Sequence, residues 1–352
     1  MAEETIFNKI QGKHIKVKAE NAILSKTISN ATNAEGALDN INSRVSALES
    51  GRSSATGKIP VRLLCIGNSL LQDAVAYLPL VLNEFSDYID YKIYLWYCSG
   101  HTLTQNYSRF VNGQTAEIFS ICENDVVWTN NSNDTTMATI LNTYEFDTLV
   151  LQEFFGQLYS NPGEYSASAK ASYDDIVDWI SARYDGDFDV YSFWETPYRG
   201  SGTFGTFTRE NTLQRLAFAE DGLEWQLLNT SCEGIIPCGV AAARAIDVAM
   251  INGLGAAGCG SADGVHSQEG LPCLMLAWTF GQWLMKKLGL PFDEAFSQVR
   301  ITQSIVTTLN VPGGNGTRID GTEAQAVAAR DVARQAAIEG EYIVNTMLAS
   351  NS

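Results

Sequence analysis

From Lys58 onward, short apolar runs alternate with longer segments in which apolar residues recur at helical spacing. The apolar runs predict buried strands at Val61–Ile66, Lys92–Tyr97, Asp125–Thr129, Thr148–Leu151 and Val190–Trp194, with another short strand near Leu227. The periodic segments predict helices at Ala74–Phe85, Ser168–Arg183, Asn211–Glu220, Val240–Asn252, Leu271–Leu288 and Glu323–Leu348. Strands that alternate with helices over this length predict an α/β fold, with helices on both faces of a parallel sheet. Because ligands bind beyond the carboxyl ends of such strands, the residues that follow each strand are the first candidates for a site.

The first 57 residues differ from the rest, because they contain neither Trp nor Tyr and are rich in Ala, Asn, Ser, Lys and Glu. Alternating a and d positions of a heptad pattern are occupied by Leu24, Thr27, Ala31, Ala34, Leu38, Ile41, Val45 and Leu48. This pattern predicts a coiled coil through residues 20–50 that joins two or three copies of the chain, and a single solvated helix is the alternative. A Gly- and Ser-rich linker follows, so the expected domains are an arm at 1–57 and an α/β domain at 58–352.

Charge and targeting signals narrow the class of protein. Forty acidic residues against twenty-three basic ones give a formal charge of -17, which makes nucleic acid an unsuitable partner. We expect no secretory signal, since the first residues lack a basic end followed by an apolar run, and no membrane span. The seven cysteines form no C-x-x-C pair and are expected to be buried free thiols.

Histidine is scarce, and this limits the possible bases for acid–base chemistry. Of the three histidines, His14 lies in the arm, which leaves His101 and His266. Asp263 precedes His266 by three residues, and a carboxylate at that spacing can accept the imidazole Nδ1–H and stabilise the imidazolium. The alternative is that Asp263 or Ser267 caps the helix that follows, with His266 on the surface.

Ser69 follows the Val61–Ile66 strand through Gly67 and Asn68, at the edge where a nucleophile would be exposed. The alternative is that Ser69 only caps the next helix. The Ser69 amide, the Gly100 amide and the Gln152 side chain all follow predicted strands, and together they predict three donors for an oxyanion. For Gln152, a structural hydrogen bond at the strand end is the alternative.

Four further residues are candidates for substrate binding. His101 and Glu153 adjoin Gly100 and Gln152, although His101 fits a surface turn equally well. Trp194 and Tyr198 follow another strand and are of the type that stacks on sugar rings, whereas packing in the core is the alternative for both.

These residues occur in the order of the motifs of the SGNH/GDSL hydrolase superfamily, which the chain resembles over residues 60–290. Ile66–Ser69 (IGNS) resembles the first block, Gly100 the glycine of the second, and Asp263–His266 (DGVH) the last. The third block departs, because Gln152 stands where most members have Gly-x-Asn-Asp. This Gln resembles the carbohydrate acetylesterase branches and a related uncharacterised bacterial branch, and Ile236–Ala241 (IPCGVA) resembles that uncharacterised branch too.

The resemblance implies a three-layer, flavodoxin-like α/β/α fold and a Ser69–His266–Asp263 mechanism that needs no metal or organic cofactor. It also implies hydrolysis of O-acyl esters, most simply O-acetyl groups, on a glycan. The arm resembles trimeric coiled-coil segments of phage tail and fibre proteins, which implies a place in a virion with other virion proteins as partners, or otherwise in the cytoplasm. The rival interpretation is a non-catalytic structural or receptor-binding virion subunit with the same fold.

Overall fold

The computed structural model describes residues 58–131, 133–154, 167–195, 209–255, 263–290 and 318–349. The predicted arm at 1–57, Tyr198 and Cys259 lie outside the described residues, so the coiled coil stays a prediction. The chain divides into a unit of Val61–Ser86 and Tyr91–Ser352 and a second unit of Met1–Pro60 and Asp87–Asp90. Every residue of the candidate site belongs to the first unit.

The described part is an α/β structure built on one mixed sheet. Its strands are β1 (Ile59–Gly67), β2 (Ile89–Tyr97), β3 (Ile118–Glu123), β4 (Thr129–Asn131), β5 (Thr148–Leu151), β6 (Asp189–Phe193) and β7 (Cys232–Ile236). Its helices are α4 (Ser69–Val75), α5 (Leu78–Asn83), α6 (Leu103–Val111), α7 (Met137–Thr143), α9 (Ala167–Ser181), α10 (Arg209–Asn229), α11 (Cys238–Ile246), α12 (Leu271–Lys287) and α14 (Glu323–Ala349).

The sheet has seven strands in the order β4-β3-β2-β1-β5-β6-β7. Strands β1, β5, β6 and β7 pair in parallel, with Leu63 opposite Thr148 and Ile66 opposite Leu151. Without β3 and β4, the order β2-β1-β5-β6-β7 is that of a doubly wound sheet whose direction of winding reverses between β1 and β5. The crevice beyond the carboxyl ends of these two strands is therefore the expected place for a ligand.

The expectation of an all-parallel sheet is wrong at one edge. Strand β3, which the sequence did not reveal, pairs antiparallel with both β2 and β4. Residues 124–128 are the whole connection from β3 to β4, and a link this short can only join antiparallel strands. The strand expected at Asp125–Thr129 begins only at Thr129.

Other boundaries also differ from the prediction, among them the helix expected at Val240–Asn252, which is α11 at Cys238–Ile246. Leu227 lies in α10, and the strand expected near it is β7, five residues further along, at Cys232–Ile236. The helix expected at Ala74–Phe85 is divided into α4 and α5, because Pro79 occupies the first turn of α5 and cannot continue the hydrogen-bond ladder of α4.

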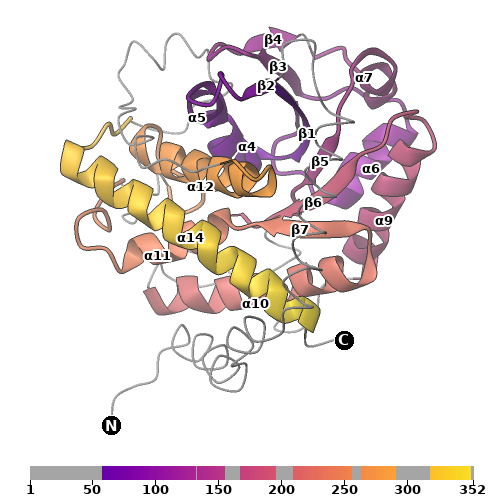
Figure 1. Ribbon diagram of the computed structural model, residues 1–352. Coiled ribbons are helices and arrows are strands. Elements are labelled where there is room, and N and C mark those ends of the chain that lie inside the picture. Colours follow the sequence, from indigo (N-terminus) through magenta and orange to yellow (C-terminus); the bar gives the residue numbers. More distant parts are fainter. Residues whose placement is uncertain are drawn as a thin grey trace, which may run out of the picture. The chain divides into compact units, whose positions relative to one another are not determined.

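Helices cover both faces of the sheet (Figure 1). On one face, α12 packs against α4, α5, α11 and α14, and on the opposite face α6 packs against α9. Leu63, Leu64, Cys65 and Ile66 of β1 have no exposed surface, as expected for a central strand covered on both sides. The cysteines at 65, 98, 122, 232, 238 and 273 are all buried and free, as predicted.

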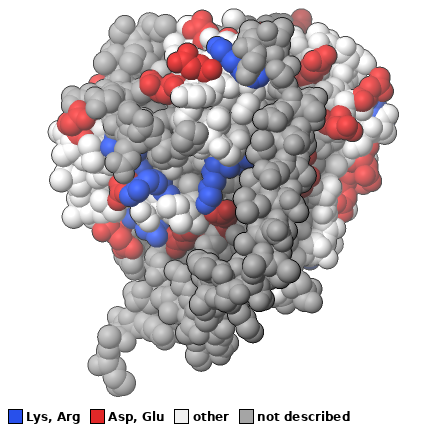
Figure 2. Space-filling view, viewed as in Figure 1, with Lys and Arg blue, Asp and Glu red and all other residues white. Residues whose placement is uncertain are grey.

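Acidic side chains are scattered over the face that Figure 2 shows, and the described Lys and Arg side chains gather there in a few small groups. Within the described residues, no helix is long and apolar enough to cross a membrane.

Candidate active site

Ser69 lies directly beyond the carboxyl end of β1, where the winding of the sheet reverses. Asn68 is the N-cap of α4, and its Oδ1 accepts the Leu70 N–H at 3.0 Å. Ser69 is the first helical residue rather than the cap, so its hydroxyl is not used to satisfy the helix end. The alternative interpretation of Ser69 as a helix cap is therefore wrong.

The structure brings Ser69, His266 and Asp263 together in one hydrogen-bonded chain. Ser69 Oγ lies 2.8 Å from His266 Nε2, and His266 Nδ1 lies 2.8 Å from Asp263 Oδ2. A carboxylate can only accept a hydrogen bond, so His266 Nδ1 carries the proton that is donated to Asp263. His266 Nε2 is then free of a proton and accepts from the Ser69 hydroxyl. This is the arrangement in which a histidine acts as a base toward a serine.

Asp263 is held by its own loop as well as by the imidazole. Its Oδ1 accepts the backbone N–H groups of Val265 and His266, each at 2.8 Å. Gly264, between Asp263 and Val265, has φ +87°, a conformation that side-chain-bearing residues rarely adopt. Partial burial raises the pKa of Asp263, but the hydrogen bonds from the His266 side chain and these backbone groups outweigh it, so the pKa lies below its ordinary value.

The helix that follows gives no support to the capping alternative for this loop. Helix α12 begins at Leu271 and its N-cap is Gly270, without a side-chain cap. Asp263 and Ser267 therefore do not cap it. His266 retains 23% of its side-chain exposure, which leaves the base accessible from solvent.

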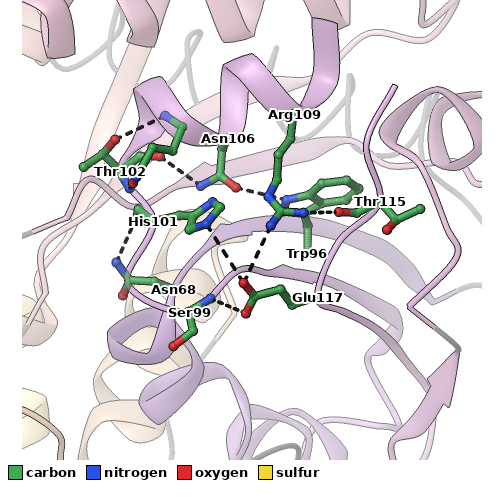
Figure 3. A network of polar contacts seen from close by, with 10 residues as sticks. Asn68, Trp96, Ser99, His101, Thr102, Asn106, Arg109, Thr115 and Glu117 are labelled. Carbon is green, nitrogen blue, oxygen red and sulfur yellow. Dashed lines mark hydrogen bonds and ion pairs between the residues drawn. The ribbon is translucent and has the colours of Figure 1, made fainter. Parts of the chain in front are cut away.

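Two backbone amides remain as candidate oxyanion donors, those of Ser69 and Gly100. Neither N–H donates to another described residue, and Gly100 lies in an exposed turn after β2. The Asn68 side chain connects the two turns, because its Nδ2 donates to the His101 carbonyl at 3.1 Å. Figure 3 shows this link and the hydrogen bond from the Ser99 N–H to Glu117, 2.8 Å long, that steadies the same loop.

Gln152 does not have the role that the sequence predicts. Its Oε1 accepts the Asn68 N–H at 2.8 Å, while its Nε2 donates to the Glu153 carbonyl at 2.7 Å and to the Glu195 carboxyl group. Both amide protons are thus used inside the protein, and the side chain has no exposed surface. The Asn68 N–H needs an acceptor, so the amide cannot be turned over to offer a donor. Gln152 supports the nucleophile turn and is not a third oxyanion donor.

Gly67 makes this support possible. A Cβ atom at Gly67 would lie 2.6 Å from Gln152 Oε1, so a larger residue would displace the Gln152 side chain from the turn.

Glu195, which the sequence did not single out, closes the buried network behind Gln152. Burial raises the pKa of Glu195 well above its ordinary value, and neighbouring Glu153 raises it too, although the hydrogen bond from Gln152 lowers it. The protonated form is favoured at this position. Its position two residues after the end of β6 is the signal that would have pointed to it.

The predicted substrate contacts are mostly structural. Glu153 is buried, and its Oε1 accepts the N–H of Leu103, the first residue of α6, at 3.1 Å and that of Phe154 at 2.8 Å. Trp194 is 1% exposed and packs in the core. Neither side chain is exposed to a ligand, because the strand ends that carry them are covered.

Of the candidates that the structure describes, His101 alone stays partly exposed beside the site. Its Nε2 lies 4.0 Å from Glu117 Oε1, and Arg109 approaches the same oxygen at 3.7 Å (Figure 3). Partial burial and the Arg109 charge lower the pKa of His101 and Glu117 raises it, so that the pKa lies below its ordinary value.

Comparison with known proteins bears on the fold. The structure resembles the crystal structure of a DUF4886 family protein from Bacteroides uniformis, with a TM-score of 0.59 and 20% sequence identity. The likeness covers 79% of this chain and 95% of that chain, and at this identity it concerns the fold alone. No family model and no curated protein matches the sequence. Within the described residues, no cluster of His, Cys, Asp and Glu could hold a metal ion.

Proposed function

We propose that this protein is a serine ester hydrolase of the SGNH/GDSL type. The single observation that carries the proposal is the chain of two 2.8 Å contacts from Ser69 Oγ through His266 to Asp263. It is assembled from two segments far apart in the sequence, at the crevice where doubly wound sheets bind ligands. These three side chains are partly exposed, so their hydrogen bonds are not needed to satisfy buried polar groups.

The reaction proceeds in two steps. Ser69 Oγ attacks the ester carbonyl carbon while His266 Nε2 takes its proton, and the Ser69 and Gly100 amides receive the negative oxygen. His266 then returns the proton to the leaving alcohol, which leaves an acyl group on Ser69. Water, deprotonated by His266, releases the acid and restores the serine. Asp263 keeps the proton on Nδ1 throughout and stabilises the imidazolium.

The proposed substrate is an O-acylated, most simply O-acetylated, glycan. This part rests on the resemblance to carbohydrate acetylesterases. The proposed setting is a phage tail, where residues 20–50 join two or three copies of the chain. Mass measurement of the full chain against a chain that starts at Lys58 tests the arm, and two monomers would rule it out.

Hydrolysis of p-nitrophenyl acetate and of acetylated glycans by wild type and Ser69→Ala tests the activity. Loss of the nucleophile is expected to lower kcat by about 1,000-fold or more. Ser86→Ala, a partly exposed serine after α5, is the control and should match the wild type. Equal activity in the wild type and Ser69→Ala would contradict the proposal, and so would a wild type that is as inactive as Ser69→Ala. Two inert proteins that bind the glycan would favour the receptor-binding alternative.

A further inference from the structure

The segment that carries Ser69 presents three polar side chains on one face. Ser69, Asp73 and Tyr77 are spaced by four residues: Ser69 and Asp73 lie one turn apart in α4, and Tyr77 follows its C-cap Ala76 and is the N-cap of α5. At this spacing, side chains lie one above another on a helix. The remaining residues of α4 are mostly apolar and buried, so a carboxylate among them is unusual.

These three side chains meet the loop that carries the base. Ser69 Oγ contacts His266 Nε2 at 2.8 Å, Asp73 Oδ2 accepts the Ser267 N–H at 2.6 Å, and Tyr77 Oη accepts the Gly270 N–H at 3.3 Å. The order along the helix matches the order along the loop. One stretch of chain thus holds both the nucleophile and the backbone next to its base.

The middle contact combines burial with a charged acceptor. Asp73 is 4% exposed and Ser267 3%, so water does not compete for the hydrogen bond. A carboxylate that accepts a backbone N–H forms a charge-assisted bond, roughly twice as strong as a neutral one. The Asp263 side chain, in contrast, is 53% exposed, so its contact with His266 is not shielded from solvent in this way.

We propose that Asp73 is a positioning residue, which sets the place of the His266 imidazole relative to Ser69 by holding the Ser267 N–H, with Tyr77 as a second support. The inference rests on the proposed function. Asp73 touches no reacting atom, and it acts through the loop. A displacement of about 1 Å between a base and a nucleophile is enough to cost on the order of 100-fold in rate.

The test compares Asp73→Ala with Asp73→Asn, which has the same shape and retains an oxygen that accepts the Ser267 N–H. Asp73→Ala is expected to lower kcat on p-nitrophenyl acetate about 100-fold, with KM changed less than about 3-fold. Asp73→Asn should recover to within about 10-fold of the wild type, since a neutral acceptor is weaker. Tyr77→Phe should lower kcat by a smaller factor than Asp73→Ala.

The controls are buried hydroxyls away from the site. Ser192→Ala removes a hydrogen bond to Gln226, 2.6 Å long, and Tyr91→Phe removes one to the Asp125 carbonyl, also 2.6 Å long. Both variants should keep kcat within about 2-fold, because neither residue contacts the loop. If Asp73→Ala does not fold, Asp73→Asn and Tyr77→Phe decide, and both must lower kcat more than the controls do.

A second readout does not depend on ester turnover. The ¹⁵N and ¹H signals of the His266 ring report its tautomer and its contact with Ser69, and Asp73→Ala should shift them while the His101 signals stay in place. If the wild type is inert toward esters, the proposed function fails, and this measurement alone decides the role of Asp73. Unchanged kcat in Asp73→Ala, a loss no larger than that of the controls, or unmoved His266 signals would each overturn the inference.

Discussion

The side-chain amide of Asn68 donates to the carbonyl oxygen of His101 across 3.1 Å, and so ties the turn that carries Ser69 to the loop that carries Gly100. The Asn68 side chain is 1% exposed, and its Oδ1 also accepts the Leu70 N–H. Together with the backbone hydrogen bond from the Cys98 N–H to the Gly67 carbonyl, 3.1 Å long, this bond fixes the relative position of the two candidate oxyanion amides.

Replacement of Asn68 by Asp tests this tie. The new carboxylate still accepts the Leu70 N–H, but its second oxygen faces the His101 carbonyl and repels it. We expect kcat/KM for ester hydrolysis to fall by about 10- to 100-fold, as misplacement of an oxyanion donor predicts. Asn112→Asp removes a comparable amide-to-carbonyl bond, to Ser108, outside the site and should leave the rate unchanged. Wild-type activity in Asn68→Asp would show that the tie is dispensable.

Gln152→Ala should be a stability variant. It removes the acceptor of the buried Asn68 N–H and leaves a cavity, which together are expected to lower the free energy of unfolding by about 2 to 4 kcal/mol. Urea unfolding measures this, with the exposed Gln114→Ala as a control that should change it by less than about 0.5 kcal/mol. Unchanged stability with a large loss of kcat would instead restore Gln152 to the oxyanion hole.

Glu195→Gln should change how stability depends on pH. Burial raises the pKa of Glu195, so the folded protein keeps a proton that the unfolded chain releases near its ordinary pKa of about 4.3. Between these two pKa values the folded state binds more protons, and the free energy of unfolding falls as pH rises. The side-chain amide introduced by Glu195→Gln would stay neutral at every pH, and its oxygen would still accept from Gln152.

Urea unfolding of both proteins at a series of pH values checks this prediction. The advantage of Glu195→Gln over the wild type should grow as pH rises above about 4.3, until the folded carboxyl group is ionised. A difference that stays constant with pH would mean that folding does not raise the pKa of Glu195.

Asp263→Asn should show how much the tautomer of His266 contributes to the rate, because the substitution leaves His266 itself in place. An Asn side chain can donate to Nδ1, which favours the tautomer whose Nε2–H cannot accept the serine proton. We expect kcat to fall by about 1,000- to 10,000-fold with little change in KM. The substitution lies in an exposed loop, so the unfolding midpoint should move little. A loss below about 10-fold would mean that Asp263 does not control the tautomer.

Apolar runs were enough to predict strands β1, β2, β5 and β6, because strands covered on both faces are apolar throughout. Strand β3 escaped because Ser120 and Glu123 interrupt the apolar residues of Ile118–Glu123. For the site, an Asp-x-x-His motif and a lone Gly-Asn-Ser motif predicted residues that the structure brings into contact.

Gln152 shows which property of a site residue the local sequence pattern does not predict. Its place at the end of a strand was predictable, but the direction of its amide depends on Glu195, 43 residues later, and on the Asn68 N–H, 84 residues earlier. Trp194 and Glu153 failed as substrate contacts for the same reason, since burial at a strand end depends on what packs over it. The polar residues Ser69, Asp73 and Tyr77, spaced by four, are a local pattern that could have predicted a shared polar face beside the nucleophile.

The contact between Ser69 and His266 joins residues 197 positions apart. A chain made from its N-terminus carries the serine long before the histidine exists, and Ser69 has no base until α12 has begun to dock. Closing so long a loop is slow compared with forming a local helix. The reactivity of the Ser69 hydroxyl should thus return with the last phase of refolding, and it can be used to report when the native structure is complete.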